Sequence, residues 1–379
     1  MTVAGGRHVL IAGASGVIGA AALEAFARMP GWRVTALSRR RPFVAEGTPF
    51  DHLSVDLRDG GACRSAVASL PPVTHAVYAA VSEAPGLVSG WRDAELIAEN
   101  GRMFANLLTP LAQAGALAHV SLLQGTKAYG VHVRPVDMVP LREESPRDDH
   151  ANFYWLHEDC ARELGASHGF SHTVFRPQVL LGSAPGAVMN PVAGIGAYAA
   201  LCHELGLAFA LPGTSEALWE MVDAELMAEA LVWAAGAPTA ANRTFNLTNG
   251  DIFVLRHAWP EVAQALGVSD AGDAPDSFAT FFARAEVQSA WTALARREGL
   301  ALAQLDDVLG QSHHYLDLLL GGSIADKQTP ALVSTIAIRQ AGFAACRDSR
   351  NSLLHQLGRM VELRLLPPMG RLRDKGNTR

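Results

Sequence analysis

Short apolar runs alternate with helix-like stretches along the first half of the chain. Strands are predicted at His8–Ala12, Arg33–Leu37, Leu53–Leu57, His75–Ala80 and Ala118–Leu123. Helices are predicted at Ala20–Met29 and Glu95–Ala114. Strands that are apolar along nearly their whole length are typical of a parallel sheet with helices on both faces. The pattern therefore predicts an α/β fold with a doubly wound parallel sheet of the Rossmann type.

The second half continues this rhythm and then becomes mostly helical. A helix is predicted at Phe153–Leu164 and a strand at Ser171–Pro177. Later helices are predicted at Val192–Glu204, Val222–Trp233 and Leu353–Pro367, with a helix-rich segment at Arg256–Leu320 and a late strand at Thr244–Thr248. We expect residues 1–182, together with 216–252, to form a nucleotide-binding domain. Residues 183–215 and 253–345 would form a smaller, mostly helical substrate-binding region, followed by a C-terminal helix and frayed tail at 346–379.

A glycine-rich turn joins the first predicted strand to the first helix. Gly13, Gly16 and Gly19 stand at the spacing of a dinucleotide-binding turn, directly after the strand. The first glycine permits the tight turn, the second lets a pyrophosphate approach the backbone, and the third lets the helix pack closely. Free N–H groups at the helix start attract the phosphates. An ordinary glycine-rich turn is the alternative, and the βα rhythm on both sides disfavours it.

The end of the second strand indicates which nucleotide is bound. Sites that prefer NAD usually carry an acid here, whereas Arg suits the 2′-phosphate of NADP. The segment Ser38–Arg41 contains three arginines and no acid, so NADP is favoured over a merely solvated basic face. Asp56, after the third strand, can hydrogen-bond the adenine amino group, and the small side chains of Ala79–Val81 let the cofactor pass.

Composition excludes several classes of protein. The 379 residues are 49% hydrophobic and 18% charged, which is enough for a large core and argues against disorder. A net charge of −6 without a basic stripe argues against nucleic-acid binding. The apolar stretch Ala187–Cys202 is shorter than the roughly 20 residues of a membrane span. Four scattered cysteines and an N-terminus without a signal-peptide layout lead us to expect a cytoplasmic protein, and the histidines show no metal-ligand spacing.

Lys127 is unusual because the chain contains only three lysines among its 31 Lys and Arg residues. Arg is planar and permanently charged, whereas Lys is a compact amine whose pKa shifts readily on burial. Lys127 is the single lysine before Lys327, and it follows a strand-like apolar run. Its isolation indicates a site that needs a compact amine, with chance as the alternative.

Tyr154 begins the predicted helix that follows the long loop after Lys127. A short-chain dehydrogenase is expected to carry Tyr-x-x-x-Lys here, but position 158 is Glu. The nearest amine is Lys127, and an ammonium close to a phenol favours the phenolate and lowers its pKa. Tyr154 and Lys127 are therefore the predicted catalytic pair. A simple packing role beside Phe153 and Trp155 is an equal alternative for Tyr154.

Several of these motifs together resemble the progesterone 5β-reductase and iridoid synthase-like group of extended short-chain dehydrogenases/reductases. The matching segments are Gly13–Gly19, Ser38–Arg40, Ser121–Tyr129, Asn152–Asp159, Phe175–Pro177 and Phe245–Asp251. The resemblance runs from about residue 8 to 260 and returns near Ala341–Phe343. This chain departs from the group at Ala128, where His is frequent, at Trp155, where a second Tyr is frequent, and in the loop Val131–His150.

The resemblance implies a reductase whose catalytic residues map onto Lys127 and Tyr154. NADPH would deliver hydride to the β-carbon of an enone or enal, and Tyr154 would stabilise the enolate oxygen. Lys127 would hold the pKa of Tyr154 down and touch the nicotinamide ribose. The predicted cofactor-binding residues are Gly13, Ser15, Gly16, Val17, Ile18, Gly19, Ser38, Arg39, Arg40, Asp56, Leu57, Ala79, Ala80, Val81, Asn100, Ser121, Tyr154, Pro177 and Val179.

Three other functions stay open at this point. The same pair could direct hydride to the carbonyl carbon, as in a carbonyl reductase or alcohol dehydrogenase. A sugar-nucleotide epimerase is disfavoured because Tyr-x-x-x-Lys is absent, and a non-catalytic NADP-sensing regulator because Tyr and Lys are both present. We expect NADPH or NADP as cofactor, a small enone or carbonyl compound as substrate, and no metal, nucleic acid or membrane partner. A homodimer is left open.

Overall fold

The centre of the molecule is a seven-stranded sheet in which all neighbouring strands are parallel. The structure, a computed structural model, describes residues 6–84, 87–214, 216–270, 272–274, 276–320 and 329–373. The last residues of the predicted C-terminal tail, 374–379, lie outside them. In spatial order the strands are β10 (Arg243–Leu247), β6 (Ser171–Pro177), β5 (His119–Leu123), β4 (His75–Tyr78), β1 (Arg7–Ala12), β2 (Trp32–Leu37) and β3 (Asp51–Leu53). The chain order reverses between β1 and β4, which confirms the doubly wound Rossmann prediction.

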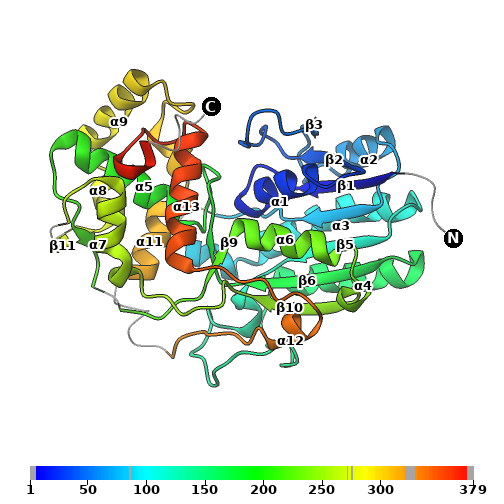
Figure 1. The fold of residues 1–379 in the computed structure, drawn as a ribbon. Helices are drawn as coiled ribbons and strands as arrows, with labels where there is room; N and C mark the ends of the chain where they lie inside the picture. Colours follow the sequence, from blue (N-terminus) through cyan, green and yellow to red (C-terminus); the bar gives the residue numbers. More distant parts are fainter. Residues whose placement is uncertain are drawn as a thin grey trace.

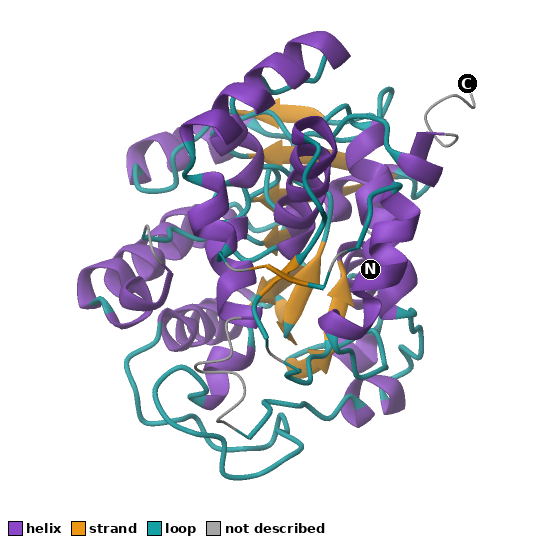
Figure 2. Ribbon diagram, turned by 90° about the vertical axis from the view of Figure 1, so that its left-hand side faces the viewer, coloured by secondary structure: helices purple, strands orange, loops and turns teal. Residues whose placement is uncertain are grey.

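Helices cover both faces of this sheet (Figures 1 and 2). One face carries α1 (Val17–Ala27) and α6 (Ala224–Ala234), and the other carries α2 (Gly60–Ser69), α3 (Ala94–Gln113) and α4 (Phe153–His168). Alternate residues of β1 point to opposite faces. Val9 and Ile11 pack with α1 and α6, whereas Leu10 and Ala12 pack with α3. Both faces of the strand are therefore buried, which explains its uninterrupted apolar sequence.

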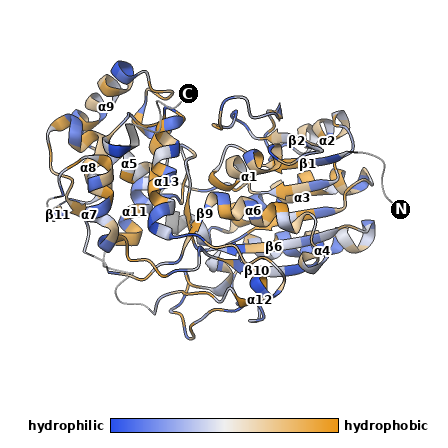
Figure 3. Cartoon of the chain, in the orientation of Figure 1, coloured by the Kyte–Doolittle hydropathy of each residue, from blue (hydrophilic) through white to orange (hydrophobic). Residues whose placement is uncertain are grey.

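A second, helical part of the chain surrounds its own hydrophobic cluster. Its helices are α5 (Pro191–Leu205), α7 (Leu255–Leu266), α8 (Phe278–Phe282), α9 (Ala285–Glu298), α10 (Leu305–Leu309), α11 (Ser312–Leu320) and α13 (Ser349–Glu362). Phe209 stacks on Trp259 with ring centroids 4.3 Å apart in this cluster. Figure 3 shows α6 largely in orange, because this helix is buried between the sheet and its neighbours. The division at residues 182/183, with 216–252 returning to the sheet, is our proposal for the domain boundaries.

The remaining elements are short. They comprise β7 (Val179–Leu181), β8 (Leu211–Pro212), β9 (Met221–Asp223), β11 (Asp273–Ala274), α12 (Ile336–Gln340) and the 3-10 helices η1 (Leu87–Arg92), η2 (Thr126–Tyr129), η3 (Pro238–Ala240) and η5 (Gly370–Arg373). Strands β7 and β9 pair with each other in parallel, apart from the main sheet. None of the helices formed by the described residues has the length and apolar character that a membrane span requires.

Three sequence predictions are wrong in their limits. The third strand ends at Leu53, so the predicted strand Leu53–Leu57 is mostly a loop. The alternation of apolar residues suggested a longer strand, and Leu57 is indeed buried against α2. Asp56, however, binds Arg58 in a tight turn, so the strand does not continue. The helix predicted at Val222–Trp233 begins at Ala224, because Asp223 caps it and Val222 lies in β9. The predicted helix Leu353–Pro367 runs instead over Ser349–Glu362.

Candidate active site

The glycine turn after β1 is shaped by close backbone contacts. Gly13 has a φ of +79°, and a Cβ there would lie 2.6 Å from the backbone of Ala79 and Ala80. A Cβ at Gly19 would lie 2.2 Å from the carbonyl oxygen of Gly13. Gly16 caps α1 without a side chain to occupy the first N–H groups, so these groups can receive a phosphate. The turn therefore fits a dinucleotide, as the spacing predicts.

The carboxyl end of β2 presents two unpaired guanidinium groups. Arg39 and Arg40 are exposed, and within the described residues neither side chain forms a hydrogen bond or an ion pair. Ser38 is buried, and its hydroxyl donates to the carbonyl of Arg40 at 2.6 Å. The Arg40 guanidinium lies within 3.4 Å of the Cβ position of Gly186, on the loop that leads to α5. These positive groups fit a 2′-phosphate.

The other predicted cofactor residues are placed less uniformly. Asp56 forms an ion pair with Arg58 at 2.6 Å, and this hydrogen bonding lowers the pKa of Asp56 to about 2. Asn100 is fully buried on α3 and holds the backbone of Ser82. Ser121 is 1% exposed inside β5, where its hydroxyl contacts His119 rather than an open surface. Ser15 and Val17 flank Gly16, and Ile18 is buried in α1. Val81 is exposed after β4. Pro177 ends β6 and Val179 begins β7.

Asn152 connects the two predicted catalytic segments. Lys127 lies on η2 and Tyr154 in the first turn of α4. The Asn152 side chain caps α4 by accepting a hydrogen bond from the Tyr154 N–H at 3.1 Å, and it donates to the Lys127 carbonyl at 3.3 Å. The Tyr154 hydroxyl lies 3.4 Å from the Cβ position of Gly125, two residues before Lys127. The structure therefore brings the two segments together.

The Lys127 ammonium lines a small pocket beside Tyr154. Its nitrogen lies 3.9 Å from a carboxylate oxygen of Glu83 and 4.4 Å from the centroid of the Trp91 ring. Burial lowers the pKa of Lys127, and the Glu83 charge opposes that shift. The pocket is lined by Ser82, Glu83, Gly90, Trp91, Leu96, Ile97, Asn100, Lys127, His132, Asn152 and Phe153.

Tyr154 is a protonated phenol in this environment. Burial raises its pKa, and Glu83 raises it further, whereas Arg176 opposes the shift. The prediction that Lys127 lowers the pKa of Tyr154 is therefore not supported, because desolvation outweighs nearby positive charge. A neutral phenol can still donate a hydrogen bond to a developing oxyanion. Within the described residues its hydroxyl donates no hydrogen bond, so it is available to a ligand.

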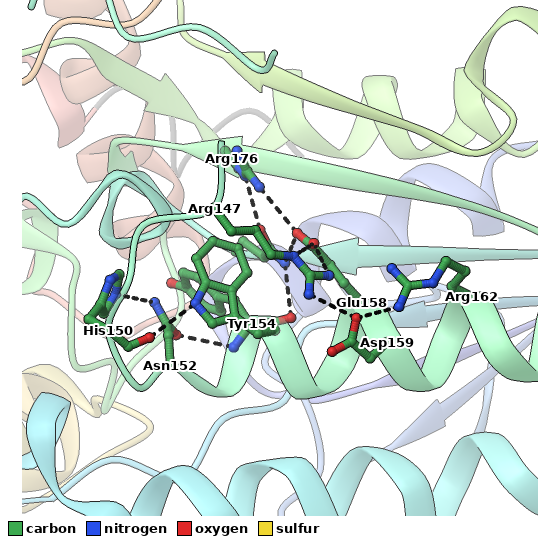
Figure 4. A network of polar contacts seen from close by, with 10 residues as sticks. Arg147, His150, Asn152, Tyr154, Glu158, Asp159, Arg162 and Arg176 are labelled. Atoms are coloured by element: carbon green, nitrogen blue, oxygen red, sulfur yellow. Dashed lines mark hydrogen bonds and ion pairs between the residues drawn. The ribbon is translucent and has the colours of Figure 1, made fainter. Parts of the chain in front are cut away.

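Glu158 occupies the position where the ordinary pattern has Lys, and its partners explain the change (Figure 4). Its carboxylate binds Arg176 of β6 at 3.1 Å and Arg147 at 2.7 Å. It also accepts a hydrogen bond from Gln124 at 2.8 Å. Position 158 is thus part of a structural ion-pair network that ties α4 to β6.

The predicted site residues do not include five polar residues of the pocket: Ser82, Glu83, Trp91, His132 and Asn152. Glu83 lies beyond the carboxyl end of β4, where ligands of open α/β sheets bind. An acidic residue at that place in the sequence could have identified it as a candidate site residue. Trp91 lies on the short 3-10 helix η1 and His132 in a turn, and no periodic pattern marks them. Among the described residues no group of three or more His, Cys, Asp or Glu side chains is arranged to hold a metal ion.

Sequence comparisons relate the chain to a known family. The model of the NAD dependent epimerase/dehydratase family matches residues 9–248. The chain is 28% identical to an (S)-8-oxocitronellyl enol synthase of Antirrhinum majus, over 94% of this chain and 92% of that protein. It is also 28% identical to a 3-oxo-Delta(4,5)-steroid 5-beta-reductase of Arabidopsis thaliana, again over 94% and 92%. The predicted resemblance is confirmed.

Solved structures share the fold. A UDP-glucose 4-epimerase of Thermotoga maritima, determined with UDP-glucose, superimposes with a TM-score of 0.63. The match covers 93% of this chain and 97% of that one at 14% identity. At this identity the likeness concerns the fold alone.

Proposed function

Because the chain belongs to the NAD dependent epimerase/dehydratase family, an enzyme family, we propose that it is an NADPH-dependent reductase of activated C=C bonds. The substrate would be an enone or enal. The observation that carries the proposal is the Lys127–Tyr154 pair, which two separate segments supply and Asn152 joins. The named relatives, an enol synthase and a steroid 5-beta-reductase, support the same reaction class.

The cofactor would lie across the carboxyl edge of the sheet. Gly13, Gly16 and Gly19 leave room for its pyrophosphate, and the start of α1 offers N–H groups to the phosphates. Arg39 and Arg40 would pair with the 2′-phosphate, which favours NADPH over NADH. When bound, NADPH supplies the hydride. We further propose a cytoplasmic location, consistent with the free cysteines.

Tyr154 and Lys127 would act on the substrate carbonyl. Hydride addition at the β-carbon moves negative charge onto the carbonyl oxygen and produces an enolate. The Tyr154 hydroxyl would donate a hydrogen bond to that oxygen, because its raised pKa keeps it protonated. The Lys127 ammonium would stabilise the same charge at short range in a buried site. A proton taken up at the α-carbon then completes the saturated carbonyl product.

An acceptor panel with product identification tests the proposal. The purified chain would be incubated with NADPH deuterated at the transferred position and with cyclic enones, enals, 3-oxo-Δ4 steroids and simple ketones. We expect oxidation of NADPH, a saturated carbonyl product, and deuterium at the β-carbon. Deuterium at the carbinol carbon of an allylic alcohol would instead identify a carbonyl reductase. No oxidation of NADPH with any acceptor would contradict both and favour a non-catalytic NADP-binding protein.

A further inference from the structure

Glu83 is a buried acid held in place by its neighbours. Its side chain is 5% exposed, and it directly follows Ser82, whose backbone is fixed on both sides by Asn100. Asn100 donates to the Ser82 carbonyl at 2.9 Å and accepts from the Ser82 N–H at 2.8 Å. This clamp from α3 gives the segment after β4 a defined path. The carboxylate of Glu83 is therefore directed into the pocket toward Lys127.

The contacts of Glu83 differ from those of an ordinary structural ion pair. Glu24 of α1 forms hydrogen bonds of 2.7 and 2.9 Å with Arg359 through both carboxylate oxygens. The Glu83 oxygen stands 3.9 Å from the Lys127 nitrogen and makes no hydrogen bond within the described residues. Trp91 Nε1 and His132 Nδ1, which also line the pocket, are buried without a well-formed hydrogen bond within the same residues, although the Trp91 N–H is close enough to Glu83 to lower the pKa of that acid. Unpaired polar atoms gathered in one buried site indicate a functional role.

We propose that Glu83 is a positioning residue, whose carboxylate is the counter-ion that keeps the Lys127 ammonium charged and fixed against Trp91. The proposal rests on the reductase function above and deepens it. A buried ammonium without a counter-ion tends to lose its proton, and a neutral amine would stabilise the enolate less. The paired charges also leave the pocket close to neutral, which suits an uncharged carbonyl substrate better than a carboxylate.

No other described group at the pocket can replace Glu83. The groups close to Lys127 are Glu83 after β4, Trp91 on η1 and His132 after η2, and Tyr154 lies nearby in the first turn of α4. His132 is neutral at physiological pH, because burial and the nearby His150 lower its pKa to about 4. Tyr154 is protonated. Among the described residues that line the pocket, Glu83 is therefore the single acid; burial raises its pKa, and the Lys127 charge and the Trp91 N–H oppose that shift.

The small number of lysines allows a direct test. With 13C-labelled lysine the chain should give three side-chain signals, from Lys127, Lys327 and Lys375, and the signal lost in Lys127→Arg is that of Lys127. We expect Glu83→Gln to lower the pKa of Lys127, read from its 13C shift, by about one to three units. The alkaline limb of kcat/KM with a cyclic enone and NADPH should move to lower pH by the same amount. Glu83→Asp, which keeps the charge, should restore most of both shifts.

Glu24→Gln is the matched control, because it removes the acid of a buried ion pair far from Lys127. It should leave the pKa of Lys127 unchanged. An unchanged pKa in folded Glu83→Gln, or an equal fall in Glu24→Gln, would overturn the proposal. A pKa that falls while the alkaline limb stays in place would also overturn it. The NMR titration needs no turnover, so a chain that reduces no acceptor would contradict the reductase function and leave the Glu83–Lys127 coupling measurable.

Discussion

At the scale of single residues, the Tyr154 hydroxyl carries the proposed chemistry. Tyr154→Phe removes the hydrogen bond to the enolate oxygen and keeps the ring that packs at the start of α4. We expect kcat to fall by about a hundredfold or more, because loss of one oxyanion donor typically has an effect of this size. NADPH affinity and the thermal midpoint should change little. Steady-state kinetics measure kcat, NADPH fluorescence measures the affinity, and thermal denaturation measures the midpoint.

Tyr78→Phe is the matched control for this substitution. Tyr78 is also buried, but it packs against Phe104 and His157, and its hydroxyl has no hydrogen-bond partner among the described residues. Removing an unpaired buried hydroxyl is close to neutral or stabilising. Full turnover in Tyr154→Phe, or an equal loss in both variants, would show that Tyr154 is not the oxyanion donor.

The sequence predicts these residues unevenly, for a physical reason. Lys127 and Tyr154 can be predicted from the sequence, because their residue types and their positions in the alternation of strands and helices both indicate a catalytic role. The role of Glu83 depends on its burial near Lys127 and on the Asn100 clamp, and both follow from how η1 and α3 pack, which the sequence does not show. Similarly, the raised pKa of Tyr154 follows from desolvation, and no spacing of residues reveals that.

At the scale of elements, the cap of α4 sets the geometry of the site. Asn152→Ala removes the hydrogen bond to the Tyr154 N–H and the one to the Lys127 carbonyl. Loss of the cap should lower the free energy of unfolding by about 1 kcal/mol. Because the two catalytic segments also lose their link, we expect kcat to fall by about tenfold or more. Chemical denaturation and steady-state kinetics test the two parts separately.

Asp348→Ala supplies the comparison. Asp348 caps α13 through a hydrogen bond from the Asn351 N–H at 2.8 Å, and α13 begins in a different part of the chain. Asp348→Ala should lower the free energy of unfolding by the same amount, about 1 kcal/mol, and leave kcat unchanged. If both variants lose activity alike, general destabilisation explains the effect and the linking role of Asn152 is wrong.

Elements were predicted well where both faces are buried or where a long apolar stripe exists. Strands β1, β2, β5 and β6 and helix α3 fall within one or two residues of their predicted limits. Helix α2, over Gly60–Ser69, was missed because it opens with two glycines and has only two buried residues, Cys63 and Val67. Its start depends on the Asp59 side chain, which accepts from Gly61 and Ala62.

At the scale of the whole molecule, the carboxyl ends and the amino ends of the parallel strands carry different groups of polar side chains. The site lies at the carboxyl ends of the strands, whereas His75 and His119 pair across the beginnings of β4 and β5. This layout follows from the doubly wound order, which the apolar pattern predicts. The packing of α5 and α7 to α11 around Trp259 was not predictable, because several orders of helices satisfy the same apolar stripes.

The buried histidines make the fold sensitive to acid. Burial lowers the pKa of His75 to about 4 and that of His119 to about 3, from 6.5, and lowers that of His157 on α4 to about 4. As the pH falls below 6.5, the unfolded chain binds protons that the folded chain does not, so the free energy of unfolding falls. At pH 5 each of the three should cost about 2 kcal/mol relative to pH 7.5. Urea unfolding at these two pH values measures the loss.

Buried acids work in the opposite direction, Glu220 among them, and a variant separates the contributions. Burial raises the pKa of Glu220 from 4.5 to about 7, so the folded chain gains protons there as the pH falls and recovers about 2 kcal/mol by pH 5. A net loss of several kcal/mol should remain. His119→Asn removes the titrating ring at Ser171, so its acid-dependent loss should be about 2 kcal/mol smaller than that of the native chain. Equal losses in both would contradict a neutral buried His119, because a group with the same pKa in both states cannot link folding to pH.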